Sequence, residues 1–281
     1  MWKRKLCMNL IGWKDRTPEE ILNTYADTGF DGFFTDWDNI EQLKKWKKLA
    51  DERGLLYKNI HAPFGRIRCL WENTADAESV LAEQIACLRD CAALGIETMV
   101  AHVFIGFRYT VKPNEAGLAY FEKIAAEAQK LGVKVAFENT EGEEFLAEVL
   151  KLADSYSSVG FCLDTGHEMC YNHSKDLLAS YGHLLAETHL NDNLGIRDFT
   201  GEHITPADDL HLLPFDGIAD WENIASRLAR LGYANPLSFE LTTDAYYAGL
   251  PMEGYVHQCY RRACRVAAMT ERALAKKAAI L

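Results

Sequence analysis

The chain has 281 residues, of which 48% are hydrophobic, and a formal net charge of −11 at pH 7. This length suffices for one large domain with a well-buried core, and the negative charge gives no overall attraction for nucleic acid. We expect no signal segment, and no apolar stretch approaches the roughly 18 residues that a membrane span requires. The eight cysteines form no CxxC pair, so we expect reduced thiols in a cytoplasmic protein without a membrane partner.

Short apolar runs rich in β-branched residues alternate with segments of helical periodicity along the whole chain. We predict strands at 6–10, 32–35, 55–60, 98–101, 134–137, 159–163, 185–189 and 236–240. Between them, apolar residues spaced by three or four predict helices, most clearly at 77–94, 116–131 and 221–231. Such alternation is typical of an α/β fold with a parallel sheet. We therefore predict that residues 1–281 form a single domain, a (β/α)8 TIM barrel.

Capping residues mark the ends of several predicted helices. Thr17 can cap the first helix, with Pro18 in its first turn and Glu20 three residues after the cap. Other helices are expected to end at a glycine before the next strand, namely at Gly54, Gly95, Gly132 and Gly232. The longer connections 191–220 and 242–254 follow the last two strands, and we expect them to be active-site loops.

Nine residues of metal-binding type recur along the chain, most of them where a predicted strand ends. They are His61, His102, Glu138, Asp164, His167, His189, Asp209, His211 and Glu240. In a (β/α)8 barrel the carboxyl ends of all strands converge on one face, so residues far apart in sequence meet there. Carboxylates and imidazoles together can bind divalent metals. The sequence therefore predicts a divalent metal site.

Several of these residues also have an alternative structural explanation. Asp164 and His167 are three apart and could simply cap the following helix. His61 and His102 could be hydrogen-bonded histidines at strand ends that form the wall of a pocket without touching metal. Asp192, together with its neighbour in the HLND segment, is expected to orient the loop after the seventh strand.

Other candidates lie near the predicted mouth of the barrel. Trp37 could stack against the apolar face of a sugar or cover the mouth. Arg197 could contact substrate from the loop after the seventh strand. Three arginines suit a small anion such as a sugar phosphate, or are ordinary surface charge: Arg66, Arg68 and Arg108. The alanine-rich stretch 266–281 is expected to pack either on the barrel or on a neighbouring subunit. The sequence therefore allows a homo-oligomer without requiring one.

Six short segments resemble the xylose-isomerase-like barrels, a family that groups sugar isomerases and epimerases with DNA-repair enzymes of the endonuclease IV type. In chain order they are HAPF at 61–64, FENTEG at 137–142, CLDTGH at 162–167, HLND at 189–192, DLH at 209–211 and FEL at 239–241. The resemblance covers nearly the whole chain, and each segment falls at a predicted strand end or in the loop after one. It implies a TIM barrel that uses a divalent metal on a small carbohydrate.

The resemblance also implies roles for individual residues. Four positions would hold one Mn²⁺, Mg²⁺ or Co²⁺ ion: Glu138, Asp164, His189 and Glu240. Two of them, Glu138 and Glu240, would also move a proton as acid and base through an enediolate. Substrate contacts would come from His61, His102, His167, His211, Arg197 and Trp37. We therefore expect an isomerase or epimerase of a ketose, a sugar phosphate or a polyol-derived compound, although the related dehydratases use the same chemistry.

A second interpretation stays open. The endonuclease IV branch uses nine ligands for three Zn²⁺ ions, and this chain has a suitable residue at each matching position, including Asp209 and His211. Such a protein would be a phosphodiesterase that cleaves DNA beside an abasic site. The loops, however, lack the dense Arg, Lys and aromatic residues expected for contacts to DNA. We therefore favour carbohydrate chemistry over nucleic acid, and both over a barrel that has lost catalysis.

Overall fold

The structure is a computed structural model that describes residues 4–198, 200, 203–243 and 246–278. Within this part of the chain, eight strands form one sheet in the order β7-β6-β5-β4-β3-β2-β1-β8, and the paired strands are parallel. The strands are β1 (Leu6–Asn9), β2 (Gly32–Asp36), β3 (Leu56–His61), β4 (Thr98–His102), β5 (Lys134–Glu138), β6 (Val159–Asp164), β7 (Leu185–His189) and β8 (Leu237–Phe239).

The barrel closes along a short seam between β7 and β8. A parallel bridge joins Leu190 to Phe239 just beyond the end of β7. The backbone N–H of Leu190 donates to the carbonyl of Ser238 at 2.9 Å, and the N–H of Glu240 donates to the carbonyl of Leu190 at 3.3 Å. These contacts complete a nearly closed (β/α)8 barrel, as the sequence predicted.

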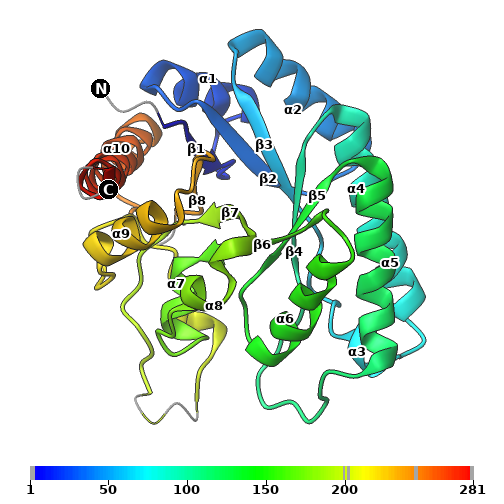
Figure 1. Cartoon of the computed structure of the whole chain (residues 1–281). Helices are drawn as coiled ribbons and strands as arrows, with labels where there is room; N and C mark the ends of the chain where they lie inside the picture. Colours follow the sequence, from blue (N-terminus) through cyan, green and yellow to red (C-terminus); the bar gives the residue numbers. More distant parts are fainter. Residues whose placement is uncertain (1–3, 199, 201–202, 244–245, 279–281) are drawn as a thin grey trace.

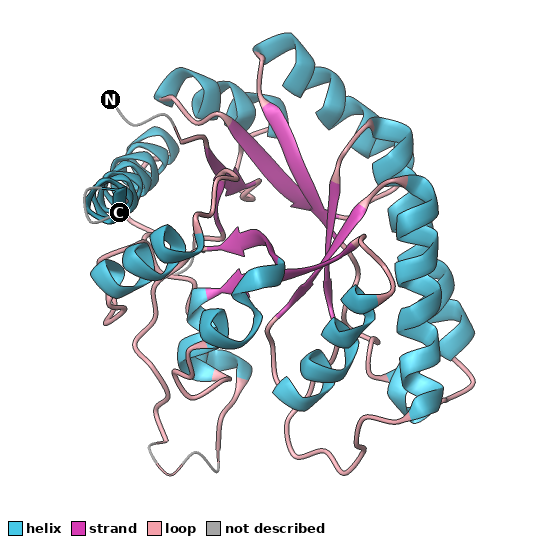
Figure 2. Cartoon of the chain, viewed as in Figure 1, coloured by secondary structure: helices cyan, strands magenta, loops and turns pink. Residues whose placement is uncertain are grey.

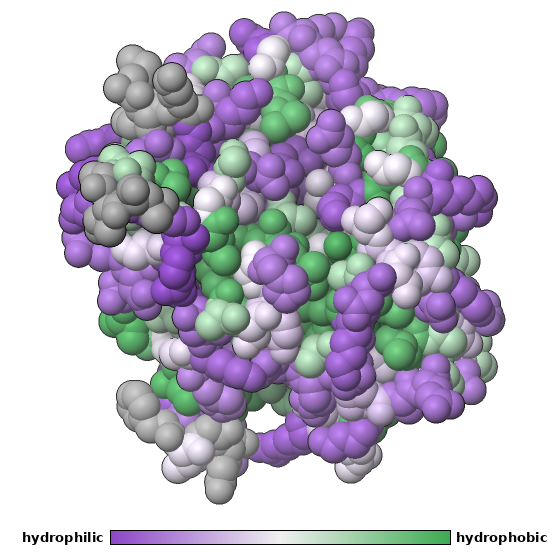
Figure 3. All heavy atoms as spheres, viewed as in Figure 1, coloured by the Kyte–Doolittle hydropathy of each residue, from purple (hydrophilic) through white to green (hydrophobic). Residues whose placement is uncertain are grey.

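Helices surround the strands (Figure 1, Figure 2). They are α1 (Pro18–Thr28), α2 (Ile40–Arg53), α3 (Cys69–Glu72), α4 (Ala77–Leu94), α5 (Glu115–Leu131), α6 (Glu143–Leu150), α7 (Thr165–Cys170), α8 (Leu177–Tyr181), α9 (Trp221–Leu231) and α10 (Met252–Ala278). In the same view, hydrophilic residues dominate the outer ring and hydrophobic residues gather towards the middle (Figure 3). The buried core itself unites strand residues such as Phe33 and Val135 with helix residues such as Leu43 and Phe121, so it lies where the helices pack on the sheet.

The predicted elements agree closely with the observed ones. Each observed strand overlaps a predicted strand, and the ends of the two differ by at most one residue. The differences have a physical cause on β4 and β5, where the ladder continues through the polar residues His102 and Glu138. A prediction from hydropathy ends each strand at its last apolar residue. The backbone hydrogen bonds of the sheet continue further, because they do not depend on the polarity of the side chain.

The capping predictions are confirmed as well. The side chain of Thr17 accepts from the N–H of Glu20, whose own carboxylate accepts from the N–H of Thr17, with Pro18 at the start of α1. The four predicted glycines end α2, α4, α5 and α9, each with a left-handed backbone. Glycine adopts this conformation without the steric penalty that a Cβ atom brings.

The barrel interior is filled by side chains. Lys58 of β3 and Glu187 of β7 form a buried ion pair with an N···O distance of 2.6 Å. Because β3 and β7 are not neighbours in the sheet, this contact crosses the inside of the barrel. A small apolar cluster of Val100, Ala136 and Cys162 comes from the adjacent strands β4, β5 and β6.

Helix α10 packs on α9 and also touches α1 and β8. Val266 and Ala267 are fully buried in it, so the described part of the predicted C-terminal packing segment does contact the barrel. Residues 279–281 of that segment lie outside the described residues. In the described part of the chain, no helix has the length and apolar character needed to cross a membrane.

Candidate metal centre

Neighbouring strands end in polar residues that lie side by side at one rim of the barrel. The register pairs Asp36 with His61, His102 with Glu138 and Asp164 with His189. Each is the last residue of its strand. Since all the strands run in the same direction, their polar ends gather at the carboxyl-terminal rim, as expected for a site in this fold.

Three of these rim residues and Glu240, which directly follows β8, bring their donor atoms together. The donor atoms of Glu138, Asp164, His189 and Glu240 all lie within 4.8 Å of one another. His189 Nδ1 lies 3.0 Å from Glu138 Oε1 and 3.2 Å from Glu240 Oε2. The side chains of Glu138 and His189 are fully buried. We call this set the quartet; three carboxylates and an imidazole at this spacing could hold one divalent cation.

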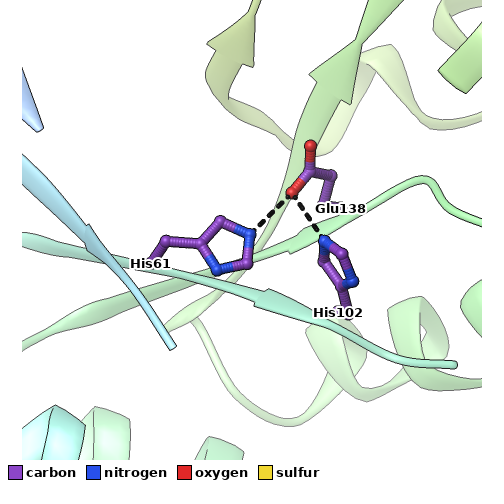
Figure 4. Close-up of side chains that lie close together, drawn as sticks. All are labelled: His61, His102 and Glu138. Atoms are coloured by element: carbon purple, nitrogen blue, oxygen red, sulfur yellow. Dashed lines mark hydrogen bonds and ion pairs between the residues drawn. The ribbon is translucent and has the colours of Figure 1, made fainter. Parts of the chain in front are cut away.

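The second oxygen of Glu138 faces a different pair of imidazoles. His61 Nε2 lies 3.1 Å from Glu138 Oε2, and His102 Nε2 lies 3.3 Å from the same oxygen (Figure 4). The donors of these three residues also lie within 4.8 Å of one another. Glu138 is therefore shared between two sets of donors, one on each side of its carboxylate.

A third set of donors surrounds Asp209. Asp209 Oδ2 is 3.0 Å from His167 Nε2 and 2.8 Å from His211 Nε2. The other oxygen, Asp209 Oδ1, is buried and has no hydrogen-bond partner among the described residues. A buried carboxylate oxygen without a donor is costly unless a proton, a cation or a substrate satisfies it.

Backbone carbonyls orient two of the imidazoles. His61 Nδ1 donates to the carbonyl of Ala62, and His167 Nδ1 donates to the carbonyl of Asn139, both at 2.8 Å. Their Nε2 atoms face carboxylates; burial alone would lower the pKa of both rings, but these carboxylates raise it. A metal ion could take the place of the Nε2 proton while the carbonyl keeps the ring in position.

Asp164 has both of the roles that the sequence left open. Its Oδ1 accepts from the N–H of His167 at 2.7 Å and thereby caps α7. Its Oδ2 accepts from the side-chain amide of Asn191 at 2.7 Å. Both bonds fix the carboxylate within the quartet, so helix capping and assembly of the site are compatible.

Burial and facing charges shift the pKa values of these groups in opposite directions. Burial alone would raise the pKa of Glu138, but the facing imidazoles, led by His189, hold it well below its usual range. Burial raises the pKa of Asp164 to about 6. Burial alone would lower the pKa of His211, but the Asp209 carboxylate raises it to about 10. In the metal-free protein, protons on imidazoles thus offset the carboxylate charge.

A cavity of about 330 Å³ opens above these donors. Its polar lining includes His61, His102, His167, Asp209, His211 and Glu240. Its apolar lining includes Phe64, Ile105, Phe107 and Tyr171. None of the described residues that line it is a lysine or an arginine. The other three members of the quartet are buried beneath this cavity, so only Glu240 of the four lines it.

Two predicted substrate contacts lie outside this cavity. The indole N–H of Trp37 donates to Asp90 of α4 at 2.8 Å, and Trp37 does not line the cavity. Arg197 is paired with Asp208 at 2.8 Å, and its side chain is 68% exposed. The arginines at 66 and 68 bind glutamates of their own surroundings and do not line the cavity either.

The cavity also contains carboxylates that the sequence reasoning missed. Asp36, the last residue of β2, and Glu141, in the loop after β5, both line it. The rule that found His61, a polar residue at a strand end, would have found Asp36 too. Glu141 lies within the FENTEG segment, three residues after Glu138, but a loop position carries no comparable signal.

A family model described as a xylose isomerase-like TIM barrel matches residues 22–259. Among curated proteins, the uncharacterized protein y4fM of Sinorhizobium fredii (strain NBRC 101917 / NGR234) is 33% identical over 190 residues. That match covers 63% of this chain and 57% of y4fM, so the chain spans less than two thirds of the length of that relative.

Solved structures share the fold at low sequence identity. An IOLI protein with a zinc atom superposes with a TM-score of 0.72 at 20% identity, covering 94% of this chain and 98% of that one. An L-ribulose 3-epimerase has a TM-score of 0.70 at 15% identity, covering 99% and 98%. A D-psicose 3-epimerase from Clostridium cellulolyticum H10, solved with D-tagatose, has a TM-score of 0.66 at 16% identity, covering 96% of each chain.

Proposed function

Because this chain belongs to the xylose isomerase-like TIM barrel family, we propose that it is a metal-dependent isomerase or epimerase of a small carbohydrate. One observation carries the proposal: the donors of Glu138, Asp164, His189 and Glu240 converge within 4.8 Å at the carboxyl-terminal rim. The sugar epimerases among its structural neighbours support the same chemistry. We also propose that residues 1–281 act as one domain.

The donor set fits a divalent cation. Three carboxylates side by side repel one another, and the raised pKa of His189 shows that a proton on this imidazole would offset part of their charge. Oxygen donors with one nitrogen suit Mn²⁺, Co²⁺ or Mg²⁺, and Zn²⁺ is also accepted by such a mixture. When bound, the metal would supply positive charge beside neighbouring carbonyl and hydroxyl oxygens of the substrate and lower the cost of an enediolate.

The two glutamates of the quartet are the proposed acid and base. Glu240 lines the cavity and would take the proton from the carbon next to the substrate carbonyl, while the electron pair of that C–H bond passes into the enediolate. Glu138 would return a proton to the opposite face of that carbon in an epimerisation. It is fully buried and its oxygens face imidazoles, so the roles of the two glutamates need separate tests.

The cavity favours an uncharged carbohydrate over a sugar phosphate. No lysine or arginine occurs among the described residues that line it, whereas Asp36, Glu141 and Asp209 add negative charge beyond the quartet. Phosphate groups are bound in proteins by Arg, Lys or helix N-termini, and carboxylates repel them. The apolar side chains Phe64 and Tyr171 suit the C–H faces of a sugar ring.

Elemental analysis of protein purified without chelator and without added metal tests the proposal first. We expect about one Mn, Co or Mg ion per chain, because the four converging ligands form one metal site. The loaded protein is then incubated in D₂O with ketoses and examined by NMR, because reversible proton removal exchanges the hydrogen next to the carbonyl. A loaded protein that exchanges no hydrogen in any ketose would contradict the proposal.

A trinuclear metal phosphodiesterase is the second candidate function. It is favoured by a specific observation, the presence of two further donor sets beside the quartet. His61 and His102 face the second oxygen of Glu138, and Asp209 joins the two remaining histidines. Buried carboxylates that bridge neighbouring cations are common in sites with several metals.

The same elemental analysis separates the two candidates. A content of about three Zn per chain would favour the phosphodiesterase, because each donor set would then hold an ion. Cleavage of a DNA duplex that contains one abasic site, compared with the same duplex without it, is the matching activity assay. The acidic cavity counts against a polyanion, which is why we place this function second.

A further inference from the structure

A second, smaller cavity adjoins the one above the quartet. It measures about 170 Å³ and shares Gly106, Phe107, Glu141 and Tyr171 with the larger cavity. Because these four residues line both spaces, the two cavities meet along one boundary. Burial raises the pKa of Glu141, and the nearby backbone of Gly106 counteracts part of this effect, so the loop after β4 lies close to the loop after β5 at this boundary.

The smaller cavity has a different chemical character. Beyond the shared boundary it is lined by Arg108, Tyr109, Gly142 and Ile204, and it contains no histidine. The rings of Phe107 and Tyr171 meet edge to face with centroids 5.6 Å apart, and Tyr171 stacks on His167 with centroids 5.0 Å apart. The cavity therefore offers aromatic surface and two planar charged groups, but no metal-binding set.

Arg108 is held at this cavity in an unusual way. Its φ angle is +56°, a left-handed conformation that is uncommon for a residue with a Cβ atom. It follows Gly106, whose φ of +132° is accessible mainly to glycine. The Arg108 side chain is exposed and has no ion pair or hydrogen bond with another residue in the described part of the chain, so its guanidinium is free to contact a ligand. A strained backbone that presents an unpaired polar side chain to a cavity points to a ligand contact.

On the basis of the carbohydrate function proposed above, we propose that this cavity is a subsite for a second, uncharged sugar ring joined to the ring that reacts at the quartet. Aromatic faces contact the C–H surface of a sugar, and the guanidinium of Arg108 and the carboxylate of Glu141 can bind its hydroxyl groups as donor and acceptor. Glu141 would repel an anionic tail. The substrate class is thus a disaccharide or glycoside.

Binding measurements by calorimetry on the Mn²⁺-loaded protein test the subsite. The probes are fructose and three glucosyl-fructoses that differ only in linkage: turanose, maltulose and palatinose. We expect at least one disaccharide to bind about tenfold more tightly than fructose, as stacking and hydrogen bonds to one added ring provide. Equal binding of fructose and all three disaccharides would overturn the subsite and leave the proposed function standing.

Two matched variants locate the effect. Ile204→Trp fills the smaller cavity, so the ratio of the fructose Kd to the disaccharide Kd should fall to about one. Ile218→Trp makes the same change at a side chain that is 67% exposed and lines neither cavity, so this ratio should stay as in the unaltered protein. If a disaccharide still binds more tightly than fructose in the Ile204→Trp variant, the second ring binds elsewhere and the inference is overturned.

Two further outcomes are decisive. Fructose 6-phosphate could bind more tightly, relative to fructose, than the disaccharides do. If this increase in affinity disappears in Arg108→Ala, the cavity binds an anion and the proposal of an uncharged second ring is wrong. If the metal-loaded protein binds neither fructose nor any of the other probes, both the proposed function and the subsite fail.

Discussion

Asp192 holds the loop that carries His211, and its removal should be among the most damaging single changes in this protein. Its carboxylate is fully buried and accepts from the N–H of Phe215 and the indole of Trp221, both at 2.8 Å, and from the N–H of Ala219 at 2.9 Å. In addition, the backbones of Asp192 and Leu212 exchange two hydrogen bonds. The expected role of Asp192 in orienting this region is thus confirmed.

The magnitude for Asp192→Ala follows from these donors. The indole of Trp221 is buried and would lose its partner without access to water, whereas the two amides belong to half-buried residues. Counting about 1 to 3 kcal/mol for the indole and about 1 kcal/mol for each amide gives a loss of about 3 to 5 kcal/mol in the free energy of unfolding. This corresponds to a decrease in Tm of about 10 °C.

Two controls make this prediction sharp. Asp220→Ala lies in the same loop and removes one capping bond to Asn223, which should cost only about 1 kcal/mol. Gly217→Ala disturbs the hydrogen bonds of Asp192 without removing its carboxylate, because the added Cβ would lie 2.2 Å from Asp192 Oδ1. Gly249→Ala, with no atom within 4 Å of its added Cβ, is the matched control for that change.

Urea unfolding followed by far-UV circular dichroism measures all four variants. We expect Asp192→Ala and Gly217→Ala to be clearly less stable than Asp220→Ala and Gly249→Ala. If Asp192→Ala were no less stable than Asp220→Ala, the buried carboxylate would not be what holds the loop.

The remaining predictions concern the metal centre and one ion pair between a buried arginine and an exposed aspartate. Glu138→Gln and Glu240→Gln should each abolish turnover in a folded protein, and near-normal activity of either variant on an identified substrate would remove that residue from its proton-transfer role. His211→Ala should weaken substrate binding and leave one metal bound, whereas a fall from about three ions to about two would favour the multinuclear site. Removal of metal by a chelator should lower the Tm, because the buried carboxylates lose their counter-charge, and an unchanged Tm would argue that no cation binds there. Burial alone would raise the pKa of Asp176, but its arginine partner on α9 lowers it, so this carboxylate contributes stability above its unfolded pKa that is lost as the pH falls through its folded pKa. Asp176→Asn should therefore be less stable than the unaltered protein at pH 7 and equally stable only in acid below the folded pKa, which lies below the usual 3.8, and a deficit that persists there would contradict this explanation.

Local patterns in the sequence were enough to predict the barrel and the polar residues at its strand ends, whereas the choice of four metal ligands among nine candidates came from the family resemblance. Alternating strands and helices depend on hydropathy within a few residues, and glycine or threonine caps mark the helix ends. Once the strands are placed, the geometry of a parallel barrel brings the last residues of β5 and β6 to one rim, although Glu138 and Asp164 are far apart in sequence.

Contacts between distant surface segments could not be predicted in the same way. Trp37 turns towards Asp90 because α4 packs beside it, and no pattern near Trp37 reports that neighbour. Arg197 pairs with Asp208 within its own long loop, whose conformation no strand or helix signal describes. Glu141 lines the cavity because the loop after β5 folds back over the site.

The seam between β7 and β8 links closure of the barrel to assembly of the metal centre. His189 is the last residue of β7 and Glu240 directly follows β8, so these two ligands stand on opposite sides of the seam, held by a bridge at Leu190 and Phe239. A cation bound to both residues would therefore link the two sides of the seam, where the sheet has its fewest backbone contacts. Without it, local opening should begin there, and the amides of β7 and β8 should exchange with solvent before those of β4 and β5.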